Sequence, residues 1–367
     1  MKVGTEVRTP VEMVWRSRSD RVFTMQAAIV TGERRLELVD FIDPEPSDGK
    51  AVVDVAFCGI CGTDLHAYQS GEPYNPAICG HEWTGTVSAA NKTVPFSEGD
   101  RVAIGIATAC GDCPTCQRGD ASHCEMALAG LLGVGPLAAA HGGFAPAIAV
   151  DATRLYHVDD KLSATEAAML EPLTVAVHSV RRTDVHLGDA VVVIGGGPIG
   201  LLVMQCARAA GAGTVVLVEP QAARRELGGQ LGADCLIDPS VCVLQEAINA
   251  HIGFTGADVV YECAGVPETI GTAVSLARRG GAVSLVGLSS RFSEISGAAW
   301  LLKEIKLTTS IGYLPEEFAI SQALVVDGRI QLKSLHTSTV SLAQMGDAFD
   351  RLAANPEEVK ILVDPHL

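Results

Sequence analysis

The chain has 367 residues, of which 48% are hydrophobic and 19% charged, and this composition is typical of a globular protein. Its length suits two domains of the usual size, roughly 100–200 residues each. The formal net charge of −16 disfavours nucleic acid and anionic membranes as partners, because both attract clusters of Lys and Arg.

The first 24 residues mix acidic and basic side chains without an apolar core, so they do not resemble a secretory signal. Glycines and a proline interrupt the most apolar long stretch, residues 190–210, whereas a membrane helix needs about 20 consecutive apolar residues. We therefore expect a cytoplasmic protein in which residues 1–24 are an N-terminal extension.

From Met25 to about Tyr156, short alternating or apolar runs are separated by Gly, Pro and Asp, which predicts a β-rich domain with many loops. The clearest runs are residues 25–30, 51–57, 84–88 and 100–104.

Ser163, with Glu166 three residues later, is typical of a capping box that opens a helix. Beyond it, helical stretches alternate with apolar, β-branched runs, a pattern that predicts a parallel sheet covered on both faces. These runs span residues 191–194, 215–218, 259–261 and 282–286. The tail from about Pro315 is helix-rich and ends in a short strand, Lys360–Val363, that can return to the first domain.

The run at 191–194 leads directly into a glycine-rich turn and then a helix, which is the context of a dinucleotide site. The turn consists of Gly195, Gly196, Gly197, Pro198, Ile199 and Gly200. Gly195 would form the tight turn, Gly197 would admit the pyrophosphate, and Gly200 would let helix and strand pack closely. The N-terminus of the helix would supply N–H groups to the phosphates.

Glu219 ends the next apolar run, 19 residues after Gly200, where a carboxylate can accept a ribose 2′-hydroxyl and repel a 2′-phosphate. This position predicts NAD as the coenzyme, with Arg224 as a further contact. Arg224 and Arg225 are both close in sequence, and they keep NADP as the alternative.

Four of the eleven cysteines follow the spacing C-x2-C-x2-C-x7-C, namely Cys110, Cys113, Cys116 and Cys124. Because no export signal is apparent, metal binding is favoured over disulfides. Four thiolates on one short lobe can close a tetrahedral zinc site with no open position, which predicts a structural zinc. An iron–sulfur cluster also takes four cysteines and is the alternative.

A second group of potential metal ligands is scattered along the chain. It comprises the motifs Cys61-Gly-Thr63-Asp64-Leu-His66, Gly80-His81-Glu82 and Glu171-Pro-Leu. With these motifs in this order, the chain from Met25 to Leu367 resembles the zinc-containing medium-chain alcohol dehydrogenase family, and within it the sorbitol, butanediol and threonine dehydrogenases. The resemblance implies an α/β fold with a GroES-like β-rich catalytic domain and a Rossmann NAD-binding domain with a doubly wound parallel sheet. We place the catalytic domain at residues 25–171, with a return segment at 315–367, and the Rossmann domain at 172–314.

By this resemblance, Cys61, which directly precedes Gly-Thr-Asp, is the first ligand of a catalytic zinc, and His81 is the second. Glu171 stands where ethanol-type enzymes have a cysteine, and Glu82 can also enter the metal's shell, so either glutamate can bind directly. Two other cysteines near these ligands are expected to pack as small apolar residues, namely Cys58 and Cys79.

The resemblance also implies a reaction, in which a bound zinc polarises the oxygen of an alcohol while hydride moves to the nicotinamide. Thr63 matches the family's hydroxyl relay, and His66 matches the base that passes the proton to solvent, with a surface histidine as the alternative. Asp64 is expected to hydrogen-bond His81 and orient it. Thr174 is expected near the nicotinamide, with core packing as the alternative.

Two other classes of protein stay open at this point. One is an NAD-binding relative without zinc or catalysis, and the other is a zinc- or redox-responsive binding protein built on the four cysteines. The first would not need the Gly-His-Glu motif, and the second would not need a complete dinucleotide turn. The sequence does not determine the substrate, although Tyr68, Trp83 and residues 131–140 are candidates to shape its pocket. A homodimer or homotetramer is expected.

Overall fold

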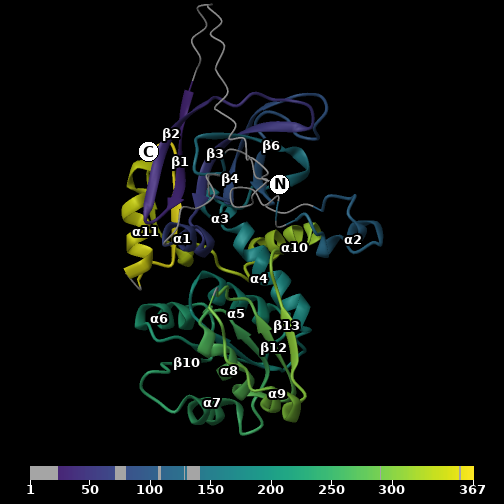
Figure 1. The fold of residues 1–367 in the computed structure, drawn as a ribbon, viewed down its shortest axis with the longest axis vertical. Coiled ribbons are helices and arrows are strands. Elements are labelled where there is room, and N and C mark those ends of the chain that lie inside the picture. Colours follow the sequence, from purple (N-terminus) through teal and green to yellow (C-terminus); the bar gives the residue numbers. More distant parts are fainter. Residues whose placement is uncertain are drawn as a thin grey trace, which may run out of the picture.

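The computed structural model describes residues 24–70, 80–105, 109–127, 129, 141–289, 291–354 and 357–367. Residues 1–23, Cys79 and residues 131–140, which carry expectations from the sequence, lie outside this part. The chain forms two units, a β-rich one at the top of Figure 1 and a mixed one at the bottom, with two helices between them.

The β-rich unit is built on a seven-stranded sheet with the order β14-β15-β3-β4-β5-β7, in which β6 also pairs with β3. Its strands are β3 (Lys50–Gly59), β4 (Glu82–Ala90), β5 (Arg101–Ile104), β6 (Ala147–Asp151), β7 (Leu155–His157), β14 (His336–Val340) and β15 (Lys360–Val363). A separate antiparallel pair consists of β1 (Thr24–Gly32) and β2 (Arg35–Ile42). All four of the runs predicted here from the sequence are strands.

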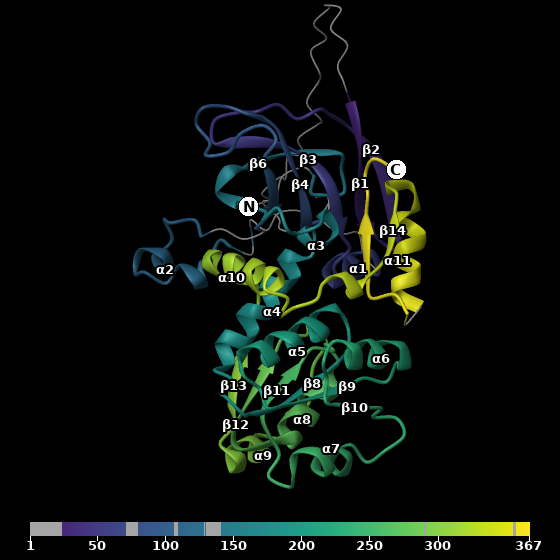
Figure 2. The same ribbon diagram turned by 180° about the vertical axis from the view of Figure 1, so that it is seen from behind.

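The C-terminal segment belongs to the same β-rich unit. Strand β15 pairs antiparallel with β3 and parallel with β14, and α11 (Met345–Ala354) packs against β2 and β15 (Figure 2). The expected return of the chain to its first domain is therefore confirmed.

The expectation of a β-rich unit missed one short helix, α1 (Gly62–Tyr68). Cys61 is its N-cap residue: its Sγ accepts the N–H of Thr63, and the Asp64 carboxylate accepts the N–H of Cys61. The other short helices of this part are α2 (Pro114–Gln117) and α3 (Ala164–Ala167). The capping box predicted at Ser163 and Glu166 opens α3.

The lower unit is a six-stranded parallel sheet with the order β10-β9-β8-β11-β12-β13. Its strands are β8 (Ala190–Ile194), β9 (Thr214–Val218), β10 (Cys235–Ile237), β11 (Ala257–Glu262), β12 (Ala277–Leu285) and β13 (Lys306–Thr309). The sequence predicted four of them and missed β10 and β13, which are too short to give a clear apolar run.

Both faces of this sheet are covered, as predicted. Val191 and Val193 of β8 share a core with α4 and α5, whereas Val192 and Ile194 share a second core with α7 and α8. The helices around the sheet are α4 (Leu170–Thr183), α5 (Pro198–Ala210), α6 (Ala222–Gln230), α7 (Leu244–Ile252), α8 (Pro267–Leu276), α9 (Gly297–Lys303) and α10 (Pro315–Val326). Among the described residues, no helix is long and apolar enough to cross a membrane.

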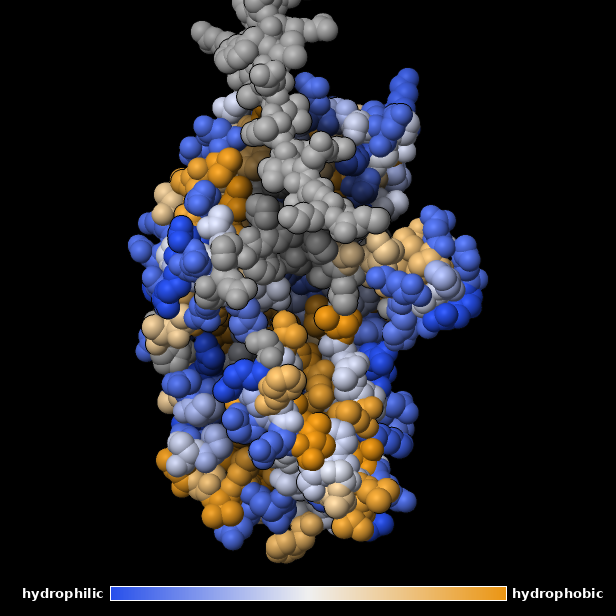
Figure 3. All heavy atoms as spheres, viewed as in Figure 1, coloured by the Kyte–Doolittle hydropathy of each residue, from blue (hydrophilic) through white to orange (hydrophobic). Residues whose placement is uncertain are grey.

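Strand β13 is the edge of this sheet, and large apolar side chains near it are exposed. We call these residues the edge patch: Leu288, Phe292, Ile295, Leu301, Leu302, Leu307 and Ile311. Figure 3 shows apolar side chains gathered on the lower half of the molecule.

Candidate active site

The glycine-rich turn connects β8 to α5, whose N-cap is Gly197 and whose first residue is Pro198. Gly195 has a φ of +100°, which favours glycine, and a Cβ on Gly200 would lie only 1.9 Å from the carbonyl oxygen of Gly195. A Cβ on Gly197 would meet nothing within 4 Å. The turn is therefore tight where helix and strand meet and open at Gly197, as a pyrophosphate site requires.

Glu219 follows β9 and is bound to the glycine-rich turn. Its Oε2 accepts the N–H of Gly196 at 2.6 Å, and its Oε1 accepts the N–H of Gln221 at 2.8 Å. A carboxylate has about four acceptor positions, so two positions are left for further donors such as ribose hydroxyls.

The two arginines close to Glu219 in sequence have different partners. Arg225 forms an ion pair with Asp238 at 3.1 Å and donates to the Glu219 carbonyl. Arg224 donates to the carbonyl oxygen of Glu358 at 3.2 Å, and its buried Nε has no hydrogen-bond partner. Among the described residues, Arg224 has no acidic partner, whereas the charge of Arg225 is paired with Asp238.

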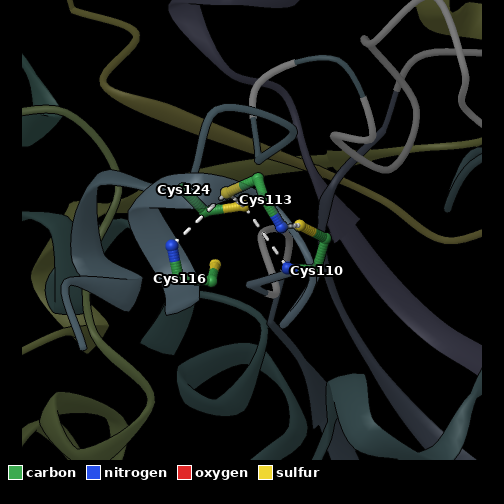
Figure 4. Close-up of side chains that lie close together, drawn as sticks. All are labelled: Cys110, Cys113, Cys116 and Cys124. Atoms are coloured by element: carbon green, nitrogen blue, oxygen red, sulfur yellow. Dashed lines mark hydrogen bonds between the residues drawn. The ribbon is translucent and has the colours of Figure 1, made fainter. Parts of the chain in front are cut away.

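The four cysteines of the predicted structural zinc site lie together on the lobe that contains α2 (Figure 4), and their sulfurs are all within 4.8 Å of one another. Backbone N–H groups point at three of the sulfurs, those of Cys110, Cys113 and Cys124. The N–H of Cys116 is the main cause that lowers the pKa of Cys113 to about 6. Such a thiol ionises readily, which suits a metal ligand.

The sulfur spacing in this lobe fits a single ion. The Sγ atoms of Cys113 and Cys124 are 4.0 Å apart. Zinc–sulfur bonds of about 2.3 Å at tetrahedral angles place the sulfurs about 3.8 Å apart. An iron–sulfur cluster occupies more space between its ligands, so the geometry favours zinc.

A second donor cluster, which we call the Cys61–His81–Glu82 cluster, is buried in the β-rich unit. Each residue offers one ligand atom, and these atoms lie within 4.8 Å of one another. Cys61 follows β3 at the start of α1, and His81 and Glu82 lie at the start of β4, which pairs with β3. The pairing of two strands therefore brings together two motifs that are 20 residues apart in the chain.

Asp64 does not make the hydrogen bond to His81 that the sequence led us to expect. Its Oδ1 is 3.6 Å from the Nδ1 of His81, and neither atom has a hydrogen-bond partner. The other oxygen accepts the N–H of Cys61 at 3.0 Å, because Asp64 completes the capping box of α1. Asp64 thus fixes the backbone of Cys61 and faces His81 only electrostatically.

Glu171 lies beside the cluster at the start of α4. Its carboxylate does not belong to the group of ligand atoms that lie within 4.8 Å of one another. Burial raises the pKa of Glu171 to about 8; His81 opposes this shift, and Glu82 adds to it. Its Oε1 is buried without a partner.

The donor atoms of this site suit a divalent cation. Cys61, Asp64, Glu82 and Glu171 are acids, and desolvation raises the pKa of the Cys61 thiol well above its usual value, with Glu82 and Asp64 adding to the shift. Asp64, His81 and Glu171 each keep a buried polar atom without a partner. Burial favours the protonated form of such acids, and a bound cation favours the ionised form that can ligate it. A sulfur, nitrogen and oxygen donor set is typical of zinc.

Lys360, which is buried next to these acids, was not among the residues predicted at the site. Its Nζ donates to the carbonyl oxygen of Ile60 at 3.0 Å and to the Oε2 of Glu82. A lysine inside the apolar run at 360–363 is the signal that could have pointed to a buried, paired charge.

The three other residues expected at the site, Thr63, His66 and Thr174, differ in how deeply they are buried. Thr63 is half-buried and His66 is exposed, both on α1 after Cys61. Thr174 is fully buried, and its hydroxyl donates to the Leu170 carbonyl at 2.7 Å within its own helix.

The expected pocket residues Tyr68 and Trp83 belong to the hydrophobic core of the β-rich unit. Tyr68 stacks on Phe349 with ring centroids 4.8 Å apart, and a Cβ on Gly143 would lie 2.3 Å from the Trp83 ring. Core packing accounts for both. Cys58 is also a buried core residue, as expected.

A Rossmann-type sheet joined to a β-rich unit with two metal donor clusters defines a two-domain, zinc-dependent oxidoreductase. Comparison with known proteins agrees. The alcohol dehydrogenase GroES-like domain matches residues 47–160, and the zinc-binding dehydrogenase domain matches residues 198–326.

The chain is 32% identical over 344 residues to 2-dehydro-3-deoxy-L-galactonate 5-dehydrogenase of Pseudoalteromonas atlantica. The aligned region covers 93% of this chain and 98% of the relative. The chain is 30% identical to sorbitol dehydrogenase of Bacillus subtilis, again covering 93% and 98%. A crystal structure from Sinorhizobium meliloti 1021, of a protein assigned as a zinc-binding dehydrogenase and bound to NADP, has a TM-score of 0.85. That protein is 33% identical, covering 94% of this chain and 100% of its own.

The chain belongs to the zinc-containing medium-chain alcohol dehydrogenase family, as its motifs indicated. It is a zinc-dependent alcohol or polyol oxidoreductase, so a noncatalytic relative and a zinc-responsive binding protein are set aside.

Proposed function

We propose that this enzyme transfers hydride between a secondary alcohol or polyol, or the matching ketone, and NAD. The observation that carries the proposal is the course of α4. Glu171 at its start lies beside the Cys61–His81–Glu82 cluster, and the helix then packs on α5, which begins at the glycine-rich turn. One helix thus links the metal donors to the coenzyme turn, as hydride transfer between the two sites requires.

The proposed substrate is a chain that carries several hydroxyl groups. The names of the two relatives denote a sugar acid and a sugar alcohol, and both oxidations would act on one secondary hydroxyl among others. Glu171 and Glu82 offer acceptors for neighbouring hydroxyls if they are not occupied by the metal.

Cys61, His81 and Glu82 are proposed to hold the catalytic zinc. A zinc ion bound there supplies Lewis acidity that lowers the pKa of the substrate hydroxyl. The Nδ1 of His81 faces Asp64 at 3.6 Å, which leaves Nε2 for the metal. We assign Glu171, which is outside the compact group, to hydrogen bonding with substrate or water beside it.

Cys110, Cys113, Cys116 and Cys124 are proposed to hold a second, structural zinc. Four thiolates leave no open coordination position. The enzyme would then contain two zinc ions per chain, only one of them accessible to substrate.

Thr63 and His66 are proposed to carry the proton away from the substrate. Thr63 is half-buried and follows the metal ligand Cys61 by two residues, whereas His66 is exposed on the next turn of the same helix. A hydroxyl on the inside and an imidazole on the outside form a route from a closed site to solvent.

NAD is proposed as the preferred coenzyme because Glu219 places a buried negative charge at the glycine-rich turn. A 2′-phosphate would be repelled there, and Arg225 is neutralised by Asp238. Arg224 is proposed to contact the coenzyme through the guanidinium N–H groups that Glu358 does not use, and Thr174, which is fully buried, to pack behind the nicotinamide site.

A homodimer is proposed, with the edge patch as its contact. The outer edge of β13 has no partner strand among the described residues, and Phe292 is fully exposed. Exposed edges and contiguous apolar patches are typical of interaction sites.

The proposed domain boundaries follow two helix starts. α4 begins at Leu170 and α10 at Pro315, so the boundaries at 171/172 and 314/315 place both connections at the beginning of a helix. The two helices pack against each other between the units.

The test is an NADH-linked screen of secondary alcohols, vicinal diols, sugar alcohols and cyclitols with zinc-loaded enzyme. We expect turnover of at least one polyhydroxylated substrate with NAD and two zinc ions per chain by metal analysis. The His81→Ala variant is the control and should be inactive. Iron as the main metal, or turnover that His81→Ala retains, would contradict the proposal.

A further inference from the structure

The ammonium group of Lys360 is buried next to the metal donors, although Lys360 is far from Cys61, His81 and Glu82 in the sequence. It lies on β15, the returning strand, and only 2% of its surface is exposed. Its Nζ bridges two segments, because it donates to the Ile60 carbonyl, next to Cys61, and to the Oε2 of Glu82. No step of the proposed reaction uses this charge.

We propose that Lys360 is a positioning residue that holds Glu82 back from the metal and so keeps the Cys61–His81–Glu82 cluster from binding its metal too tightly. The inference rests on the proposed assignment of this cluster as the catalytic zinc site.

The ammonium and a metal ion compete for the same carboxylate. A hydrogen bond from Nζ uses one acceptor position on Oε2 of Glu82, so this position is lost to a metal while the other positions of the carboxylate stay open. In addition, a buried positive charge near a divalent cation repels it, and this repulsion is strong where water is excluded. Lys360 therefore weakens the third ligand without removing it.

The local backbone is shaped to fit this pair. A Cβ added to Gly59 would lie 2.5 Å from Oε2 of Glu82 and 3.5 Å from Nζ of Lys360. Only a glycine at this point of β3 leaves the carboxylate room to reach the lysine. The pair is thus a built feature of the strand that leads to Cys61.

The backbone position of the first metal ligand does not depend on Lys360, although the ammonium charge also favours the Cys61 thiolate. The N–H of Ile60 donates to the carbonyl of Ile361 at 3.0 Å, and the N–H of Cys61 donates to Asp64 at 3.0 Å. With Lys360 replaced, these two bonds still hold Cys61 in place. The direct hydrogen bond of Lys360 is to Glu82, so a Glu82→Gln background isolates the effect that reaches the metal through this carboxylate.

The change in the rate of zinc release distinguishes a positioning role of Lys360 from a merely structural one, because the two roles predict opposite signs. If Lys360 only supported the fold, its loss would loosen the site and zinc would leave faster. If it holds Glu82 back, its loss frees a full carboxylate ligand and zinc leaves more slowly.

The experiment measures the release of zinc from full-length, zinc-loaded protein to a chromophoric chelator. We expect two phases in the wild type, one from each site, and the phase of the four-cysteine lobe is the internal reference. Lys360→Met should slow release from the Cys61–His81–Glu82 cluster by about 10–100-fold, which is the size, with the opposite sign, of the usual effect of removing a group that supports a metal ligand. Lys360→Arg, which keeps the charge, should release zinc much as the wild type does.

Two further variants make the test decisive. Lys360→Gln removes the charge but can still donate hydrogen bonds, so it should give the same sign if Lys360→Met does not fold. In a Glu82→Gln background, Lys360→Met should no longer slow release. Unchanged or faster release in both neutral variants overturns the inference, whereas a wild type that holds zinc only at the cysteine lobe overturns the proposed function instead.

Discussion

The two metal donor clusters of this enzyme are built in opposite ways. The four cysteines of the lobe lie within residues 110–124, and three of their sulfurs accept backbone N–H groups of other cysteines in the lobe. The Cys61–His81–Glu82 cluster takes its residues from the turn between β3 and α1 and from the start of β4, and is surrounded by the buried ionisable groups of Asp64, Glu171 and Lys360. A local cluster with no open position holds a fold together, whereas a non-local cluster with unsatisfied polar atoms is suited to chemistry.

The largest effect on turnover is expected when a ligand is removed from the non-local cluster. Cys61→Ala should abolish turnover while thermal unfolding stays close to wild type, because the surrounding strands do not depend on the sulfur. Metal analysis should show one zinc lost per chain. Cys58→Ala, which changes a buried cysteine three residues away, is the control and should keep activity; equal loss in both variants would contradict the assignment of Cys61.

Removal of a hydroxyl next to the same cluster should cost less than removal of a ligand. Thr63→Val keeps the size of the side chain but deletes the proposed proton path, so kcat should fall by about 10²–10⁴-fold, the usual contribution of general acid–base catalysis. Zinc content and NAD binding should be unchanged. Thr63→Ser restores a hydroxyl and should recover most of the rate; a Val variant as fast as the Ser variant would exclude the relay.

Removal of a ligand from the four-cysteine lobe should lower the stability of the protein more than its turnover. Cys113→Ala removes one of four thiolates, so the free energy of unfolding should fall by at least about 2 kcal/mol, because metal binding here contributes directly to folding. The fraction that stays folded at low temperature should keep its catalytic zinc and a near-normal turnover per active site. Thermal unfolding together with active-site titration checks this, and a loss of turnover without a loss of stability would contradict the division between the two clusters.

The same contrast explains what could be predicted from the sequence. The cysteine lobe and the turn from Gly195 to Gly200 are contiguous, so spacing alone describes their geometry. The partner of Asp64 depends on a capping box that opens on a cysteine, which is not a usual cap residue, and the partners of Lys360 depend on the register of the returning strand, which no local pattern reveals. For the same reason Tyr68 and Trp83, expected at the substrate pocket, belong to the core.

The coenzyme site allows a finer test within the lower unit. Glu219→Ala should weaken NAD binding by roughly tenfold, because one charged hydrogen-bond acceptor is lost, and should relax discrimination against NADP. The variant also leaves the N–H of Gly196 without its partner, so NAD and NADP must be compared in the same protein. Glu226→Ala, an exposed glutamate on α6, is the control. A wild type that already prefers NADP would show that this reading of Glu219 is wrong.

His66 should give the smallest effect, because it lies at the solvent end of the proposed path. In His66→Ala, water and hydroxide can take the proton from Thr63 directly, so kcat should fall by only about tenfold or less at neutral pH, below the range for a buried acid–base group. The deficit should be largest at low pH, where hydroxide is scarce, and should vanish as pH rises. A kcat–pH profile checks this, with His186→Ala as the control, since that histidine is also exposed but lies between α4 and β8. If the His66 variant follows the wild type at every pH while Thr63→Val is slow, the proton leaves from Thr63 without an imidazole, and the path ends at the helix rather than beyond it.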